Sequence, residues 1–562
     1  MAAPYRRLLL LRRIPTPQLH TAAASHCLVP TALVKPSSGP SAAERVETPL
    51  STLWPGSAGD GNFKHSWHSK LGSSVGPVLI GQAAFLLGLS NSYASAQEDS
   101  VSPAAPSDQA EANATGLQRI EDGSVVSNEH TAKWRVFTDN ARDFFQKKQL
   151  AEAENLFQAA LLEAKEGFGL RDPHVASALN NLAEFCRLKK EYEKAELLYL
   201  EAIEILEESF GSDDIRVATA LHSLGMCYHL HHKFAQAQTC YERALKIEGR
   251  VMGVGNPEYA STLYLLAKVL SIQGERRAAE SLAEESIRIL EEAGLGESPT
   301  CIQRMKYLST ELIKSKQFAE AEIWQRKMLH TLELSKGWDS LHTTHTAEDL
   351  SLTLQALGKF KESEELLERS LAAKKKILPE GHFLVAGTLV HLARLTLLKF
   401  ACDVKNSNND VATYYIARAQ QHCNDSIRIT EGILNPSSTD QNKFNSTSAT
   451  DREKIAATVI LLQTLDVIGL TDITAKHVQA PWEQDYTSTE GALHKCISLY
   501  REPDTRRLVT KVVKQNFLRC LRALLEMVED HFLTQQTMEL QELLSEARQI
   551  IEELGGESIN NQ

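Results

Sequence analysis

The hydrophobic and small residues of this chain recur with a period of 42. From Ala141, steps of 42 reach a small residue every time, at Ala183, Gly225, Ala267, Ser309, Ser351 and Ala393. A leucine stands directly before six of these seven residues. Twelve positions after the first six lies a second small residue, at Ala153, Ala195, Ala237, Ala279, Ala321 and Ser363. A period of this size indicates stacked supersecondary units.

Each unit is predicted to be two helices joined by a short turn. The turns are polar or contain glycine, as in residues 189–191 and 273–275, which suits a helix break. We expect the first small residue to let the two helices of a unit approach closely. We expect the second small residue to lie where the first helix of the next unit packs. A larger side chain there would lower the stability by about 1–3 kcal/mol. The predicted fold is all-α, a right-handed solenoid of antiparallel helix pairs with one quasi-linear core.

The third unit resembles the tetratricopeptide repeat. The residues that match its signature in type and spacing are Leu224, Gly225, Tyr228, Ala237, Tyr241 and Ala244. That family's usual period is near 34, and the extra residues here fall in loops such as 168–173 and 252–257. With Leu179–Ala183, these loops resemble the long repeats of kinesin light chains. The resemblance covers residues 131–400 and implies a scaffold that binds protein or extended peptide.

The resemblance also implies a binding groove on the concave face, built from the first helix of each unit. Aligning the units predicts these groove residues: Arg142, Asn180, Asn181, Glu184, Arg187, His222, Met226, His229, Tyr264, Lys268, Lys306, Tyr307 and Arg394. In related repeats the Asn181 position bonds the main chain of a bound peptide, and an amide suits this because it both donates and accepts. The cations Arg142, Arg187, Lys268 and Lys306 favour an acidic partner. The alternative is that these residues form only a solvated inner wall.

The N-terminal residues 1–74 have the composition of a transit peptide or a disordered tail. Residues 1–43 contain no Asp or Glu and carry two pairs of arginines, Arg6–Arg7 and Arg12–Arg13, which is typical of organelle targeting. Early arginine pairs favour a mitochondrion, with a chloroplast as the alternative.

The next segment, 75–96, is apolar and ends in Ala94–Ala96. Its apolar run is shorter than the roughly 20 residues that span a bilayer. Three interpretations stay open: a cleaved sorting segment, a membrane anchor over 75–93, or an inert linker. Residues 97–130 have too few large apolar groups to fold and are predicted to be a disordered linker.

The repeats are predicted to cover 131–434. In the seventh unit a polar insertion at 402–410 separates the two helices, which makes Ala419 the second small residue. A linker follows at 435–451. Residues 452–562 are predicted to be a degenerate repeat with capping helices at about 452–468, 488–500, 505–531 and 536–554, and a loop at 470–487. The kinesin light chains carry a heptad coiled coil ahead of their repeats, and we find none here, so a motor-associated role is not expected.

Composition narrows the function. The formal net charge of −12 opposes binding to phosphate backbones, which counts against the rival interpretation of a helical-repeat RNA-binding protein in an organelle. The nine cysteines show no CxxC pair, and the histidines at 229, 231, 232, 342 and 345 are assigned to the groove or to turns. We find no phosphate loop and no nucleophile with a base at recognisable spacing. The sequence therefore predicts no catalytic residue, cofactor or metal, and a protein that is not an enzyme.

Overall fold

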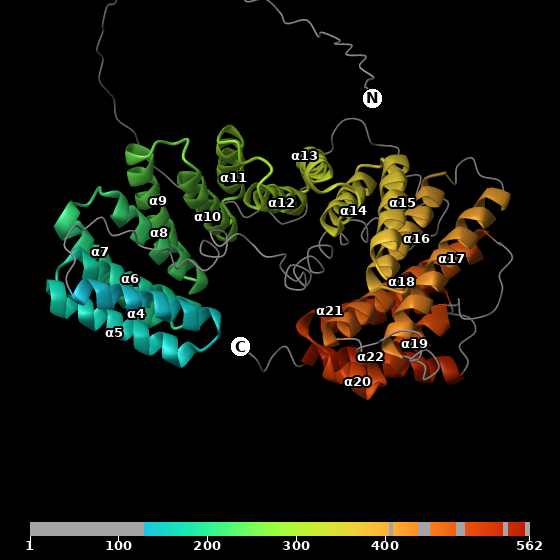
Figure 1. Ribbon diagram of the computed structural model, residues 1–562. Helices are drawn as coiled ribbons and strands as arrows, with labels where there is room; N and C mark the ends of the chain where they lie inside the picture. Colours follow the sequence, from blue (N-terminus) through green and yellow to red (C-terminus); the bar gives the residue numbers. More distant parts are fainter. Residues whose placement is uncertain (1–128, 404–408, 436–449, 479–488, 532–537, 557–562) are drawn as a thin grey trace, which may run out of the picture. The chain divides into compact units, whose positions relative to one another are not determined.

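The computed structural model describes residues 129–403, 409–435, 450–478, 489–531 and 538–556. The predictions for residues 1–128, and most of the predicted linker at 435–451, lie outside the described residues. Every regular element within the described ranges is an α-helix (Figure 1). The all-α fold is therefore confirmed.

Seven helix pairs follow one another along the chain, and we call the first helix of each pair its A helix and the second its B helix. The pairs are α4 (Glu129–Gln146) with α5 (Leu150–Phe168), α6 (Pro173–Leu188) with α7 (Tyr192–Phe210), α8 (Ile215–Leu230) with α9 (Phe234–Val251), α10 (Pro257–Gln273) with α11 (Arg276–Glu292), α12 (Pro299–Lys314) with α13 (Phe318–Lys336), α14 (Leu341–Ala356) with α15 (Phe360–Ile377), and α16 (Phe383–Asp403) with α17 (Asn409–Leu434). Each B helix packs on its own A helix and on the next one. The fold is a tandem array of repeats one to seven.

Repeated local signals start and end these helices. The side chains of Asp172, Asp214 and Asn256 each accept a hydrogen bond from the backbone N–H two residues later, which caps an A helix at its N-terminus. The turn from A to B passes through a residue with positive φ, a conformation that ends helices. These residues recur at the 42-residue period: Lys148, Lys190, His232, Gly274, Lys316 and Gly358.

The first set of small residues lies between the two helices of a repeat, as predicted. All seven are buried. A Cβ added to Gly225 would lie 2.6 Å from Cε1 of Tyr241 on the paired helix. In repeat six the second small residue also contacts its own A helix, because Ser363 Oγ donates to the Ser351 carbonyl oxygen at 3.0 Å. Both small residues there meet inside one repeat, because a short turn brings positions twelve residues apart to the same height on antiparallel helices.

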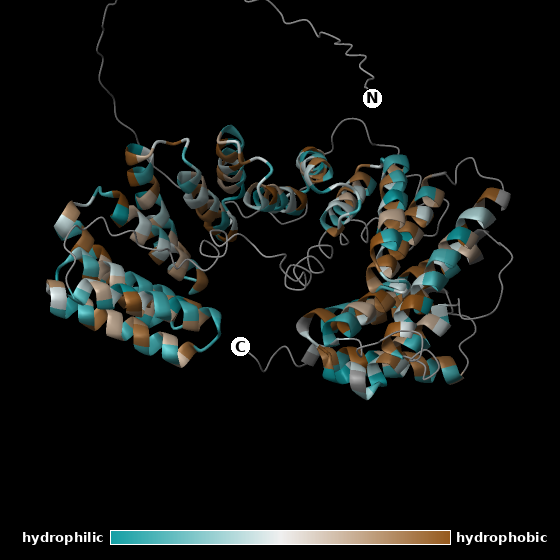
Figure 2. Ribbon diagram, in the orientation of Figure 1, coloured by the Kyte–Doolittle hydropathy of each residue, from teal (hydrophilic) through white to brown (hydrophobic). Residues whose placement is uncertain are grey.

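The apolar core becomes thinner in repeat six, which the sequence analysis did not predict. One large cluster of buried apolar residues runs from Trp134 to Leu332, and another from Ala386 to Leu554. Between them, repeat six has only small apolar clusters. Its A helix buries threonine, serine, glutamate and glutamine instead, and a hydroxyl such as that of Ser351 bonds to its own helix, at 2.8 Å from the Glu348 carbonyl oxygen. The helices carry both hydrophobic and hydrophilic residues (Figure 2).

The C-terminal part consists of α18 (Asp451–Val478), α19 (Thr489–Arg501), the short α20 (Pro503–Arg507), α21 (Lys511–His531) and α22 (Met538–Gly556). The predicted loop at 470–487 is wrong for residues 470–478, which continue α18. Leu470 and Ile473 are buried, and the hydroxyls of Thr471 and Thr474 bond to carbonyl oxygens one turn back, at 2.7 and 2.6 Å. These internal bonds let polar residues sit inside a buried helix.

Helix α18 is a core element. Helices α17, α19 and α21 pack against it, and α22 packs against α19 and α21. Within the described residues, segments Phe383–Cys402 and Asp451–Ala475 are long and apolar enough to cross a membrane. Because 72% and 89% of their apolar windows are buried inside the protein, we assign both to the core.

Candidate functional site

All thirteen predicted groove residues lie on A helices. Asn181, Glu184 and Arg394 are buried, and the other ten are half-buried. Several of them bond within the chain, so the set does not form one uniform binding surface. Contacts within the chain distinguish the groove residues that support the fold from those that are available to a partner.

Two of the predicted cations are paired inside the chain. Arg187 Nε donates to Glu184 Oε2 at 2.9 Å, and the hydroxyl of Tyr199 donates to the same oxygen at 2.6 Å. Arg142 NH1 lies 3.3 Å from an Asp139 carboxylate oxygen. The expectation that Arg142 and Arg187 attract acidic partner groups is therefore weakened, because neighbouring carboxylates already balance both charges.

Arg394 is also placed differently from the prediction. It is only 4% exposed and its NH2 group lies 3.3 Å from Asp466 Oδ2 on α18. The seventh A helix is covered by α18, which the repeat alignment did not place there. Arg394 therefore holds the C-terminal helices to the repeats and is not open to a partner.

His222 faces the interior. Its Nδ1 lies 2.8 Å from Thr262 Oγ1, and that hydroxyl donates to Glu248 Oε1 at 3.0 Å. Burial lowers the pKa of His222 to about 4 and raises the pKa of Glu248 to about 7, because desolvation disfavours the charged form of either group. We therefore assign His222 to a buried polar network that joins α8, α9 and α10.

A group of two tyrosines and two cations lies on α10 and α12, and we call it the tyrosine–cation cluster: Tyr264, Lys268, Arg304 and Tyr307. The rings of Tyr264 and Tyr307 meet edge to face with centroids 5.2 Å apart. Lys268 Nζ lies 5.8 Å and the Arg304 guanidinium carbon 5.5 Å from the Tyr264 ring centre. Both cations are within reach of the electron-rich ring face.

Neither cation of this cluster has a carboxylate partner within the described part of the chain. Burial lowers the pKa of Lys268, and it lowers the pKa of Arg304 to about 10. Arg304 donates to Ser286 Oγ at 2.6 Å and to Ser261 Oγ at 2.8 Å, so its hydrogen bonds are to neutral groups. The cluster therefore holds positive charge that the fold does not neutralise.

Arg304 was not predicted as a site residue, although the repeat period contains a signal for it. The corresponding positions in repeats two, three, four, six and seven are all small: Ala178, Ala220, Thr262, Thr346 and Thr388. Repeat five therefore differs from these repeats, because it has a long cationic side chain at a position where they have a small residue.

Three polar atoms on the A helices α6 and α8 have no hydrogen-bond partner among the residues described. They are Asn180 Oδ1, Asn181 Nδ2 and His229 Nδ1. Burial, reinforced by the nearby Lys268, lowers the pKa of His229. Buried polar groups are usually satisfied, and each exception costs about 1–3 kcal/mol. Such groups on consecutive A helices are suited to bonding another polypeptide.

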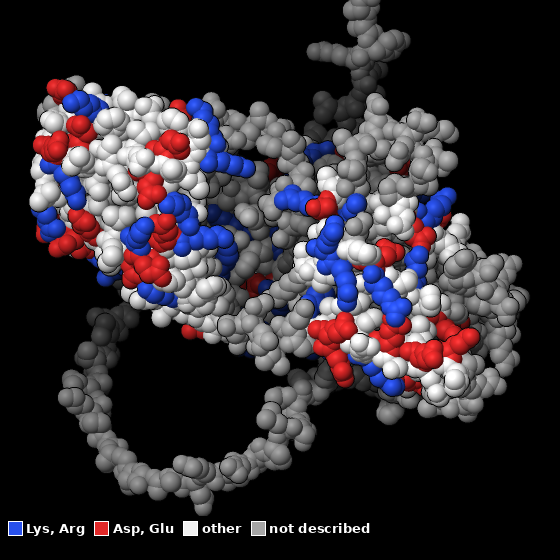
Figure 3. Space-filling model, turned by 90° about the horizontal axis from the view of Figure 1, so that it is seen from below, with Lys and Arg blue, Asp and Glu red and all other residues white. Residues whose placement is uncertain are grey.

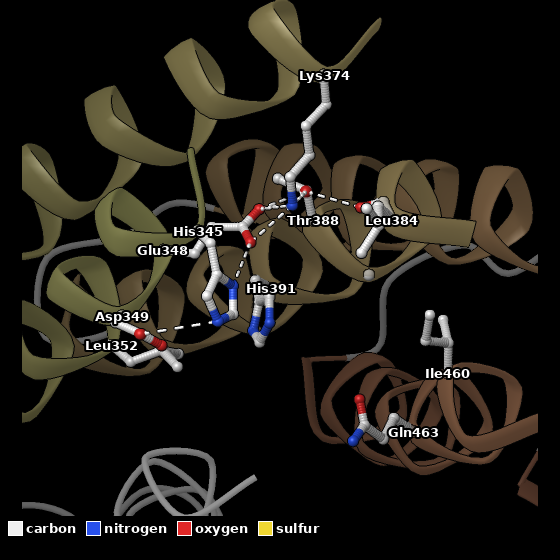
Figure 4. A pocket seen from close by; sticks show the side chains of 11 residues that line it. His345, Glu348, Asp349, Leu352, Lys374, Leu384, Thr388, His391, Ile460 and Gln463 are labelled. Carbon is white, nitrogen blue, oxygen red and sulfur yellow. Dashed lines mark hydrogen bonds and ion pairs between the residues drawn. The ribbon is translucent and has the colours of Figure 1, made fainter. Parts of the chain in front are cut away.

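A second site lies in a pocket between α14, α15, α16 and α18 (Figure 4). The buried pair Glu348 and Lys374 forms one wall, with Nζ to carboxylate distances of 2.6 and 2.7 Å. Asp349 and His391 line it as well, and both occupy the Asn181 position four and five periods later. The sequence analysis missed these two residues, although its own period points to them.

The structure offers little to a metal ion. Among the described residues, His130, Glu163 and Glu166 form a group whose ligand atoms lie within 4.8 Å of one another. His130 Nδ1 and Glu163 already hydrogen-bond at 2.9 Å, and Glu166 is exposed. We assign no metal site to this group.

Surface charges of both signs are mixed on the face shown in Figure 3. Ion pairs join successive B helices, as between Lys327 and Glu291 at 2.6 Å and between Arg369 and Glu333 at 3.1 Å. Exposed pairs like these contribute about 0–1 kcal/mol each. They pair charges of neighbouring B helices, in contrast to the tyrosine–cation cluster.

The tandem helix pairs and the unpaired polar groups on the A helices define a helical-repeat scaffold for protein interaction. Tetratricopeptide repeat profiles match residues 135–208, 174–248 and 216–292, and another matches residues 343–384. Residues 135–292 and 343–384 therefore contain tetratricopeptide repeats. These repeats are a non-catalytic scaffold family that binds proteins or peptides. A comparison with curated proteins finds no match.

Several solved structures are similar to this chain. A putative kinesin light chain from Podosopora anserina, with nearly identical TPR-like repeats, is 18% identical, covers 36% of this chain and 96% of its own, and has a TM-score of 0.33. BtubC (BKLC) from P. vanneervenii is 17% identical over 44% and 92%, with a TM-score of 0.33. The apo form of RapI is 13% identical over 77% and 99%, with a TM-score of 0.42. None of these comparisons supports the RNA-binding alternative.

Proposed function

We propose that this protein is a passive scaffold that binds an acidic, extended segment of another protein along the A helices of repeats two to five. The observation that carries the proposal is the tyrosine–cation cluster, where the half-buried Lys268 lacks a carboxylate partner and the buried Arg304 adds a second positive charge that no carboxylate balances. A glutamate or aspartate of the partner would supply the missing charge beside the tyrosine rings. The amide of the half-buried Asn180 would pair with the partner's main chain, because an amide both donates and accepts.

We also propose that the scaffold acts inside an organelle, most readily a mitochondrion, and that residues 75–93 bring it to a membrane. The absence of acidic residues from 1–43 and the two arginine pairs support import. Imaging a fluorescent fusion of residues 1–130 with organelle markers tests this, and a diffuse cytosolic signal would refute it.

Replacing Lys268 with glutamate is expected to weaken partner capture at least tenfold. The substitution puts a negative charge where the partner's carboxylate would bind, and tenfold corresponds to about 1.4 kcal/mol. The full-length chain is immobilised, and retained proteins are quantified by mass spectrometry. Lys268→Met, which removes the charge without reversing it, should give a smaller loss.

Lys246→Glu is the matched control, because Lys246 is an exposed lysine on the B helix α9. It makes the same change in net charge on the opposite class of helix and should leave capture unchanged. Circular dichroism confirms that all three variants keep their helicity. Equal losses for Lys246→Glu and Lys268→Glu would point to a nonspecific charge effect and contradict the proposal.

A further inference from the structure

The pocket in repeats six and seven has features that the acidic-partner proposal does not use. It encloses a cavity of about 40 Å³, which is more than one water molecule requires. Its polar lining comes from His345, Asp349, His391 and Gln463, and its apolar lining includes Leu384 and Ile460. Figure 4 shows that α18 supplies Ile460 and Gln463 from across the cavity, facing the side chains of α14 and α16.

One carboxylate in this pocket, that of Asp349, is not balanced by a close positive charge. Glu348 and Lys374 balance each other, and Thr388 Oγ1 donates to the same Glu348 oxygen at 2.5 Å. Asp349 has a weaker partner, since its Oδ2 lies 3.9 Å from His345 Nε2. Its other oxygen, Oδ1, has no hydrogen-bond partner in the residues that the structure describes. The pocket therefore presents a net negative charge.

Three further polar atoms around the cavity are unsatisfied within the described ranges. They are His345 Nε2, His391 Nδ1 and Gln463 Nε2. Burial lowers the pKa of His391 to about 4, so its imidazole is neutral at pH 7 and keeps one nitrogen able to accept a hydrogen bond. The Gln463 amide has an oxygen as well as a nitrogen to present. The lining thus offers a carboxylate oxygen and imidazole nitrogens as acceptors, with the Gln463 amide beside them.

We propose that this pocket binds the ammonium group of a lysine side chain from the polypeptide held along the A helices. An ammonium group has three donors and a positive charge, which match Asp349 Oδ1 and the imidazole nitrogens. The apolar walls would contact the methylene stem of the lysine. A carboxylate would be repelled by Asp349, and an apolar group would leave the acceptors unpaired. The inference rests on the proposed function and assigns the partner a lysine in addition to its acidic residues.

The δ-methyl group of Ile460 is a suitable probe, because it borders the cavity and a Cβ added at Gly387 would lie 3.7 Å from it. Methyl NMR spectra of the full chain are recorded during titration with Nα-acetyl-lysine N-methylamide. We expect a saturable shift of the Ile460 signal. The Nα,Nε-diacetyl analogue keeps the stem but lacks the charge and should bind at least tenfold more weakly. Glycine N-methylamide, an α-ammonium without the stem, should also bind more weakly.

Two variants separate binding from folding. Asp349→Asn removes the unbalanced charge and should lower the affinity for the lysine probe at least tenfold. Glu365→Gln, a substitution at an exposed position of α15, should leave that affinity unchanged. Gly387→Ala narrows the cavity with only an ordinary contact to Ile460. This variant should bind the lysine probe more weakly. Its melting temperature should not fall, because alanine favours the helix.

The proposal is overturned if the diacetyl analogue binds as well as the lysine probe, if Asp349→Asn binds normally, or if Ile460 does not shift, which would leave only water in the cavity. These results are independent of the partner. Loss of capture by Lys268→Glu with no lysine binding would refute this pocket alone. Lysine binding together with unchanged capture would refute the acidic-segment proposal alone.

Discussion

Replacing Glu348 with alanine is expected to lower the free energy of unfolding by about 3–5 kcal/mol, because it leaves Lys374 buried without a counter-charge. Lys374 is 3% exposed and makes both of its short ion-pair contacts with this one carboxylate. Thr388 and Ser370 lose an acceptor in the same variant. Urea unfolding, together with hydrogen exchange of α15 and α16, measures the effect and locates it in repeats six and seven.

The double variant Glu348→Leu, Lys374→Met is the control. Removing both charges of a buried pair is often neutral, so the double variant should recover most of the loss caused by Glu348→Ala. A single-variant cost below about 1 kcal/mol, typical of exposed ion pairs, would show that the pair is solvated.

The same pair makes stability depend on pH. Burial by itself would raise the pKa of Glu348, but attraction to Lys374 outweighs it and holds the pKa well below its ordinary value of 4.5. A carboxyl group with a depressed pKa in the folded state stabilises fully above its unfolded pKa, and that contribution is lost as the pH falls below about 4.5. As the pH is lowered below 4.5, the double variant should therefore lose less stability than the natural chain.

Replacing Gly225 with leucine is expected to cost about 1–3 kcal/mol through overpacking. Even a Cβ at this position would lie 2.6–3.0 Å from three ring atoms of Tyr241. Tyr241 is fully buried, so its ring cannot move aside without displacing other core residues. Thermal unfolding by circular dichroism should give a lower melting temperature and a spectrum that is still helical.

Thr219→Leu is the matched control, because Thr219 lies on the same helix, α8, and is exposed. The substitution adds a similar apolar side chain where there is room and should change stability by no more than about 0.5 kcal/mol. If the two variants were equally stable, the close approach of α8 and α9 at Gly225 would be contradicted.

The sequence predicted the repeat fold well because packing imposes a period on it. A small residue at every close helix contact leaves a direct trace, as Gly225 does, and so do the leucines before these residues. The contact of Ser363 with its own A helix was not predicted, because spacing alone does not say which neighbouring helix a side chain meets. Residues 470–478 were misassigned because threonines normally favour loops, and their bonds back to the helix backbone are visible only in three dimensions.

The site was less predictable than the fold. The repeat alignment identified Tyr264 and Lys268, but it treated Arg187 as a free cation. The pairing of Arg187 with Glu184 depends on side-chain conformations that a period does not specify. Arg394 was assigned to the groove because nothing in the degenerate C-terminal sequence shows that α18 covers it. Asp349 and His391 were missed because their side chains differ from the asparagine expected at that position.

The central claim is that the partner binds to the A helices and not to the B helices. Photo-cross-linking tests it most directly, with p-benzoylphenylalanine introduced either at Met226 on the A helix α8 or at Leu197 on the B helix α7, where the natural side chain is 69% exposed. The account predicts that Met226 cross-links to an acidic segment of the captured protein and that Leu197 does not. Cross-linking from Leu197 with none from Met226 would contradict it.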